Sequence, residues 1–273
     1  MGPFFLLELV FSSGMLSSVL PWLFVFAIGQ GLFLCVALLS LRQTPAALAN
    51  RILAGLVLLM VLVIAHAWLS VQQLFGRYPQ AASAIATLPL LLGPLLWLYL
   101  RSLLLQNRMA RQDAWHLLPF GLAVLAWAPL YLQPAGDALA WRAGHPHAML
   151  LLALFAAAKA AHFCTYFALS GRLILRLQHT QPDWPLVGAL RRLMAWLAGG
   201  LLASAVVLAF ELAGVEPPLS SDAVSGIALT VFIYGLAYLA MRMPLGGRLL
   251  APAAEPPAAK PRYAAGLLKD AER

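Results

Sequence analysis

The chain has 273 residues, of which 62% are hydrophobic and 10% are charged, and its mean hydropathy is +0.84. Soluble domains typically carry about 25% charged residues, so this composition excludes an ordinary soluble protein and predicts one embedded in a membrane. The formal net charge of +8 would suit binding to nucleic acid, but the positions of the basic residues indicate a different role for that charge.

Seven long apolar runs follow one another along the chain, each close to the roughly 20 residues that one helical crossing of a bilayer requires. We expect membrane spans at 20–41, 52–73, 84–105, 115–133, 148–171, 192–214 and 223–242, separated by turns that contain proline or glycine. Each span must be helical, because a lipid-exposed backbone can satisfy its hydrogen bonds only within its own segment. The predicted fold class is all-α, a polytopic bundle of seven transmembrane helices.

The basic residues predict the orientation of this bundle. Of the 18 Lys and Arg residues, 15 lie in or beside the first, third and fifth loops or in the C-terminal tail. The opposite side keeps only Arg77 and Arg142, and Lys159 lies within a span. Because an excess of Lys and Arg in short loops marks the cytoplasmic face, we expect the N-terminus outside and the C-terminus inside.

The chain changes character after Met243. Residues 1–243 make up the predicted transmembrane domain, whereas residues 244–273 are rich in Pro, Ala and Gly and have too few large apolar side chains to build a core. We expect residues 244–273 to be a cytoplasmic linker. Its last stretch, PRYAAGLLKDAER, becomes helix-prone again and leads toward an output domain that residues 1–273 do not contain.

The sequence carries no motif of a soluble enzyme. It has no glycine-rich phosphate loop, no HExxH, no CxxC pair and no GxSxG. We therefore expect no catalytic activity, no cofactor and no metal. His145 and His147 flank Pro146 in one predicted loop, but no third ligand lies nearby in the sequence, so a solvated loop is favoured over a metal site.

Four ionisable residues fall within the predicted spans. Lys159 lies near the middle of the fifth span, and His162, three residues on, shares its helical face. Glu211 lies toward the outer end of the sixth span, and His66 lies in the outer half of the second. Because ionisable groups in a bilayer are costly and often functional, these four are the candidates for a ligand or signal pocket. The favoured interpretation is a lysine held by backbone carbonyls or reaching a water pocket; a proton or ion relay and an ion pair between Lys159 and Glu211 also stay open.

Two motifs stand on either side of the third loop. The third span contains LPLLLGPLLWLYLRSLL, and the fourth opens with WHLLPF. Together they resemble the membrane-embedded N-terminal sensor domain of a bacterial group of AraC-type transcriptional regulators, in which a bundle of membrane helices precedes a cytoplasmic helix-turn-helix DNA-binding domain. The matching positions are Gly93, Pro94, Tyr99, Arg101, His116, Pro119 and Phe120.

Other segments extend the resemblance. ANRILAGLVLL resembles the start of that family's second helix, and FCTYFALSGRLILRL, with Tyr166, resembles the end of its fifth. In the tail, Arg262, Tyr263 and Leu268 occupy positions of the family's junction segment, although Gly266 stands where Ser is usual. The family's DNA-reading helices would follow Arg273, and residues 1–273 contain no helix-turn-helix pattern. The resemblance thus implies a truncated or split regulator, or a stand-alone membrane domain.

The resemblance implies a signal-sensing module in the bacterial inner membrane. Its expected partners are the lipid bilayer, a second copy of the chain and an unidentified small-molecule or membrane signal, with DNA bound only through the missing domain. Two alternatives stay open: the sensor region of a membrane histidine kinase or other signalling enzyme, and a small membrane transporter. A transporter built from repeats should show related halves, and spans 1–3 share no evident motif with spans 5–7.

Overall fold

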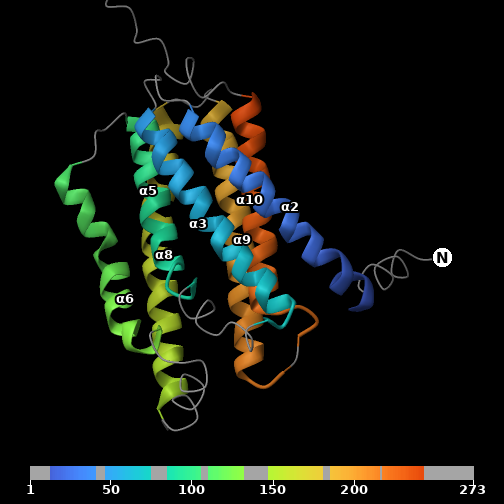
Figure 1. Cartoon of the computed structure of the whole chain (residues 1–273). Coiled ribbons are helices and arrows are strands. Elements are labelled where there is room, and N and C mark those ends of the chain that lie inside the picture. Colours follow the sequence, from blue (N-terminus) through green and yellow to red (C-terminus); the bar gives the residue numbers. More distant parts are fainter. Residues whose placement is uncertain are drawn as a thin grey trace, which may run out of the picture.

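The computed structural model describes residues 13–40, 47–74, 85–105, 110–131, 147–180, 185–215 and 217–242. Within these ranges all regular structure is helical, as predicted (Figure 1). The helices are α2 (Ser13–Ser40), α3 (Ala47–Val71), α5 (Pro89–Leu105), the 3₁₀ helix η2 (Arg111–Leu117), α6 (Leu118–Tyr131), α8 (Ala148–Thr180), α9 (Pro185–Leu212) and α10 (Ser221–Arg242).

Each predicted span coincides with one of these α-helices, but the boundaries differ. α2 begins at Ser13, earlier than predicted, and α5 begins at Pro89, later than residue 84. Just before α5, the Leu88 N–H bonds the carbonyl three residues back at 3.0 Å, which makes a tight turn instead of a helix. Pro89 suits the first position of a helix, because its missing N–H would have no partner there.

Among the described residues, four helices are long and apolar enough to cross a membrane, namely α2, α3, α9 and α10. α5 is apolar but shorter, and α8 is long but carries Lys159 and His162. The 14 residues of α6 extend roughly 21 Å, less than the roughly 30 Å of a bilayer's hydrocarbon core. The structure therefore shows an all-helical protein with four helices able to span a bilayer by length and composition.

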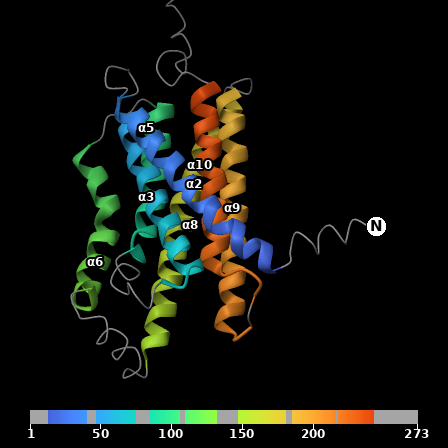
Figure 2. The ribbon, with the colours of Figure 1, turned by 45° about the vertical axis from the view of Figure 1, so that its right-hand side comes forward.

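The helices pack around α3. This central helix contacts α2, α5 and α10, while α9 packs on α10 and α8 packs on α5. The contact between α8 and α9 is smaller than these. α6 lies at the edge of the bundle and meets it mainly through η2 and α5 (Figures 1 and 2).

The core is apolar and its helices approach closely. Phe24 of α2, Met60 of α3 and Ile233 of α10 are almost fully buried. A side chain at Gly31 of α2 would clash with Val61 of α3, and other glycines allow similar approaches between α9 and α10. Small residues of this kind let helices pack tightly where lipid surrounds them.

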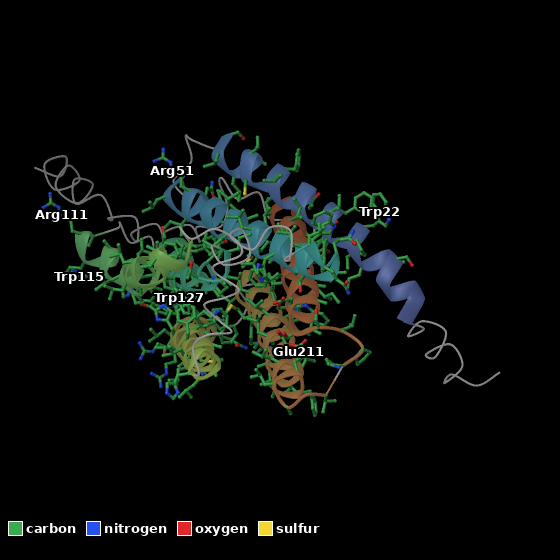
Figure 3. All side chains as sticks on the ribbon, turned by 60° about the horizontal axis from the view of Figure 1, so that its bottom comes forward. Trp22, Arg51, Arg111, Trp115, Trp127 and Glu211 are labelled. Carbon is green, nitrogen blue, oxygen red and sulfur yellow. The ribbon has the colours of Figure 1, made fainter. Side chains whose placement is uncertain are left out.

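Large apolar side chains also cover the outside of the bundle. The exposed fraction is 66% for Trp22, 69% for Phe33, 72% for Leu125 and 68% for Leu202. Trp22 points away from α2 in Figure 3. Soluble monomers rarely expose wide apolar surfaces, so this exterior is compatible with contact to lipid.

Helices that follow one another in the chain alternate in direction, and this gathers arginines from distant parts of the sequence at one end of the bundle (Figure 1). We call this the cationic end, and the other the opposite end. α3 and α9 begin at the cationic end, and α5, α8 and α10 finish there (Figure 1). Its described arginines are Arg51, Arg101, Arg111, Arg172, Arg176, Arg191, Arg192 and Arg242.

Candidate functional site

Gly93 sets the distance between α5 and α8. A Cβ added at this position would lie 2.9 Å from Cβ of Tyr166, closer than real side chains approach. Glycine therefore lets the two helices pack at this level. The contact with Tyr166, in the fifth predicted span, therefore explains why glycine precedes Pro94 in the motif of the third span.

Pro94 leaves one carbonyl of α5 without its helical partner. Proline has no N–H, so it cannot bond the carbonyl of Leu90 four residues earlier in α5. The ring of His162, on α8, interacts with the backbone of Leu90 at the level of this freed carbonyl. Neighbouring groups commonly satisfy the freed carbonyl in this way in membrane helices. α5 accordingly continues without interruption through Pro94.

Tyr166 connects two histidines and a tryptophan. Its hydroxyl lies 2.8 Å from Nδ1 of His116, near the end of η2. Its ring meets that of His162 edge-on at 4.9 Å, and Trp97 packs edge-on against His116 at 5.0 Å. Such ring pairs add about 0.5–1.5 kcal/mol beyond the area that they bury. We call Trp97, His116, His162 and Tyr166 the aromatic cluster; it joins α5, η2 and α8.

An ion pair continues this cluster at the cationic end. Nη2 of Arg101 donates to Oδ2 of Asp113 at 2.6 Å, and the backbone N–H of Ala110 donates to the same oxygen at 2.8 Å. The Arg101 guanidinium also lies over the ring of Trp97, 4.9 Å from its centroid. Burial acts to raise the pKa of Asp113, but the two hydrogen bonds and the charge of Arg101 outweigh it, so this pKa lies below its ordinary value. The ion pair fastens η2 to α5.

Lys159 lies in a second group, nearer the opposite end. Its ammonium donates to the carbonyl of Ala86 at 3.0 Å and lies 4.9 Å from the ring centroid of Phe155. It also attracts Asp222, in the first turn of α10. Oδ2 of Asp222 is 4.0 Å from Nε2 of His66, on α3. We call Lys159, His66 and Asp222 the charged cluster; it joins α3, α8 and α10, and it includes the backbone carbonyl contact that the sequence favoured.

Glu211 has a separate role as a helix cap. Its carboxylate accepts the backbone N–H of Ser221 at 2.8 Å and the Ser221 hydroxyl at 2.7 Å. Unpaired N–H groups and the helix dipole favour negative charge at the start of α10. The ion pair between Lys159 and Glu211 does not form, although the structure describes both residues. Glu211 faces Ser221, and the carboxylate that interacts with Lys159 is Asp222.

The two clusters adjoin on α8. Lys159 of the charged cluster and His162 of the aromatic cluster are three residues apart and share a helical face. Of the four candidate pocket residues, Lys159 and His66 interact electrostatically, His162 belongs to the neighbouring cluster and Glu211 stands apart. The charged cluster at the start of α10 and the aromatic cluster at η2 thus meet adjacent turns of the same face of α8.

Sequence reasoning missed Trp97, Asp222 and Asp113, although signals for all three existed. Trp97 lies four residues from both Gly93 and Arg101, so all three share one face of α5. Asp222 follows two serines at the start of α10, which is a typical helix start. Asp113 lies in the first turn of η2. These patterns predict positions on helices but not the partners across the bundle.

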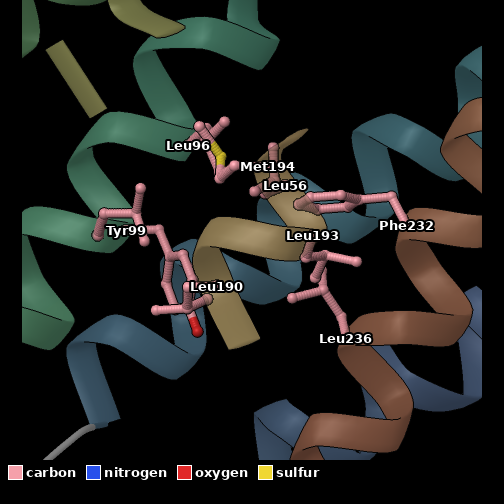
Figure 4. A pocket seen from close by; sticks show the side chains of 9 residues that line it. Leu56, Leu96, Tyr99, Leu190, Leu193, Met194, Phe232 and Leu236 are labelled. Carbon is pink, nitrogen blue, oxygen red and sulfur yellow. The ribbon is translucent and has the colours of Figure 1, made fainter. Parts of the chain in front are cut away.

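Other motif residues lie elsewhere. Tyr99 is buried and lines a small cavity between α3, α5, α9 and α10 (Figure 4). Its volume is about 10 Å³, barely the space of one water, and its other lining residues are apolar. This cavity is therefore not the candidate signal pocket. Pro119 and Phe120 begin α6, whereas the junction residues Arg262, Tyr263 and Leu268 lie outside the described residues.

No metal centre is found in the part of the chain that the structure describes, where no three His, Cys, Asp or Glu residues form a group suited to an ion. His145, one of the paired loop histidines, lies outside the described residues. No protein-family model matches the sequence, and neither curated proteins nor solved structures show a significant match to it. The likeness to the AraC-type sensor domain therefore rests on the short motifs quoted above.

Proposed function

We propose that this chain is a signal-sensing membrane module that passes a change in its helix bundle to a cytoplasmic output domain. Its seven helices cross the bacterial inner membrane with the N-terminus outside and the C-terminus inside. The arginines at one end of the bundle support this orientation, because an excess of basic residues marks the cytoplasmic side. α10 finishes at that end, where residues 243–273 follow it.

The observation that carries this proposal is the position of α10 between the charged cluster and the C-terminal segment. Asp222 in its first turn faces His66 and Lys159, and its last residue, Arg242, lies at the cationic end. At about 1.5 Å of rise per residue, α10 separates these two residues by roughly 30 Å. A proton or ligand that changes the attraction among these three ionisable groups would move α10 relative to α3 and α8. Such a proton or ligand can act as a signal only if it binds one of the two helix arrangements more tightly than the other.

The output domain that we propose is a helix-turn-helix DNA-binding domain of the AraC type. The supporting motifs are LGPLLWLYLR, WHLLPF and PRYAAGLL. Gly93, Arg101 and His116 from the first two motifs contribute to the contacts that join α5, η2 and α8. Conformational coupling between the charged and aromatic clusters would give these motif residues a role in the signal.

The gene sequence downstream of codon 273 tests the identity of the output domain. An in-frame helix-turn-helix domain is the expected result. A histidine-kinase core in that frame would contradict the proposal and establish the alternative, a sensor kinase. A reporter fused after Arg273 tests the orientation independently, since activity on the periplasmic side would contradict it.

The role of the charged cluster is tested by output from a transcriptional reporter controlled by the full-length protein. Lys159→Ala and Asp222→Asn should each change that output severalfold with membrane insertion unchanged, because each removes one charge of the cluster. Cys164→Ser is the matched control, since Cys164 is exposed on α8 outside both clusters. Unchanged output in both charge variants would remove the cluster from the mechanism.

A further inference from the structure

Four arginines on two adjacent helices crowd one part of the cationic end. Arg172 and Arg176 lie one turn apart in the last third of α8, and Arg191 and Arg192 lie in the first two turns of α9. All four side chains are exposed. At about 1.5 Å of rise per residue, all four lie within roughly 12 Å of the α8–α9 link and so at a similar depth. We call these four residues the arginine patch.

Acidic residues are scarce in the part of the sequence that carries the arginine patch. From Ala138 to Phe210 the sequence holds a single acidic residue, Asp183. Arg191 donates to the neutral side-chain oxygen of Gln178 on α8 at 3.0 Å, which brings its guanidinium across to the neighbouring helix. Arg172 and Arg192 have no acidic partner among the described residues. The patch is therefore complementary to an anionic group.

The protein leaves open space beside the patch. A side chain added at Gly171 of α8 would meet nothing within 4 Å, and one at Gly188 of α9 would meet only Nη1 of Arg192, at 3.8 Å. Toward the middle of the bundle the surface turns apolar, since Leu169 is 38% and Trp196 is 52% exposed. Leu169 lies three residues from Arg172, and Trp196 four from Arg192, so each lies below an arginine on the same helical face.

We propose that the arginine patch holds the headgroup of an anionic phospholipid, with the acyl chains along Leu169 and Trp196. Guanidinium groups bind phosphate oxygens in pairs, with a geometry that other cations lack. Basic residues between membrane helices at the cytoplasmic surface are suited to such headgroups. A zwitterionic lipid is disfavoured because its own ammonium balances its phosphate. This inference rests on the proposed function only in requiring the bundle to lie in a bilayer with the cationic end among headgroups.

Native mass spectrometry of the full chain, purified in a neutral detergent, tests the proposal. The probes are cardiolipin, phosphatidylglycerol and, as the neutral lipid, phosphatidylcholine. We expect retention of the two anionic lipids but not of phosphatidylcholine. The triple variant Arg172→Gln/Arg191→Gln/Arg192→Gln should bind cardiolipin about tenfold or more weakly, because each arginine at an anionic surface contributes to affinity. Arg176 stays unchanged because it already has an interaction of its own.

Two matched variants make the test specific. Arg51→Gln/Arg111→Gln removes exposed arginines at the same end but on α3 and η2, and it should keep wild-type affinity. The Arg→Lys version of the triple variant should recover part of the lost affinity, because it keeps the charge but not the paired hydrogen bonds. Circular dichroism should show equal helicity in all variants, and a triple variant that has lost helicity is replaced by its single substitutions.

Three results would overturn the proposal. These are unchanged affinity in the triple variant, equal loss in the Arg51/Arg111 control, and displacement of the lipid by inorganic phosphate, which would indicate a small soluble anion. Failure of the proposed function is distinguishable, because lipid retention is measured without any reporter or output domain. A kinase core downstream of codon 273 would contradict the proposed output domain and leave the lipid site intact.

Discussion

The α2–α3–α10 part of the bundle and the η2–α6 segment are held in place by different forces. In the first, large apolar side chains such as Phe24, Met60 and Ile233 are buried, and the helices approach closely at Gly31. In the second, α6 lies at the bundle edge with Leu122 and Leu125 exposed (Figures 1 and 2). Its segment is fastened chiefly by polar contacts of η2.

The contrast indicates which part of the molecule can change its conformation at low cost. Packed helix interfaces resist small displacements, because close packing makes any shift costly. A segment held by an ion pair, one hydrogen bond and a few ring contacts can detach without disturbing the core. We therefore expect η2–α6 to open locally at lower free energy than the core unfolds. Figure 3 shows Trp115 and Trp127 on this peripheral segment.

The largest effect is expected from overfilling the core. Gly31→Leu should destabilise the bundle by about 3 kcal/mol, because its side chain must displace Val61. Gly29→Leu is the matched control on the same helix, since a side chain there meets nothing within 4 Å. Thermal unfolding in detergent micelles measures both. Equal stability of the two variants would contradict the packing of α2 on α3.

Breaking the ion pair should affect η2–α6 and leave the core intact. Arg101→Gln is expected to cost about 1.5–3 kcal/mol, the usual contribution of a hydrogen bond to a charged group. Hydrogen exchange in residues 118–131 should then accelerate by one to two orders of magnitude, while α3 keeps its protection. Arg111→Gln is the control, because Arg111 is exposed on the same segment. Faster exchange spread evenly over all helices would contradict a local opening.

A smaller effect is expected from the hydroxyl of Tyr166. Tyr166→Phe removes the hydrogen bond to His116 but keeps the ring contacts, and it should cost about 0.5–1.5 kcal/mol. Tyr234→Phe on α10 is the comparison, since Tyr234 is 41% exposed. The exchange of α6 amides measures the difference. If the two variants behave alike, the His116–Tyr166 bond does not hold η2.

The smallest effect is a dependence on acid. The pKa of Asp113 is lower in the folded protein than in the unfolded chain. Its contribution to the stability of η2–α6 is therefore fully present at pH values above the ordinary carboxyl range. That contribution is lost as the pH falls through the ordinary value to the folded pKa. The difference in α6 exchange between wild type and Asp113→Asn should accordingly shrink below about pH 4. The difference between wild type and Arg111→Gln should stay constant, and a constant difference for Asp113→Asn would contradict the shift.

The helices were predictable from the sequence, but their lengths were less so. All seven predicted spans coincide with helices, because hydropathy and turn residues act locally. Prolines altered the boundaries, as where α5 starts at Pro89, and the 3₁₀ helix η2 leaves α6 shorter than the predicted span. The structure supports crossing by length and composition for four of the seven helices.

The candidate site was predictable only in part. A lysine in an apolar run is visible in any hydropathy profile, so Lys159 was found from the sequence. Its neighbours were not, because Ala86 and Asp222 are each more than sixty residues away in the chain. Glu211 was equally conspicuous but faces the start of α10. The sequence allows an estimate of how deep in the bilayer a residue lies. It does not show which faces of two helices are in contact.

Local sequence patterns are therefore enough to predict that the chain is helical and apolar, where its helices lie, and which polar residues those helices carry. The packing of the helices adds that Asp222 is the carboxylate near Lys159, that His162 meets the backbone of α5 near Pro94, and that Arg101 fastens η2. The physical reason is that helix formation depends on neighbours in the chain, whereas charge pairing and backbone satisfaction depend on which helices become neighbours in space.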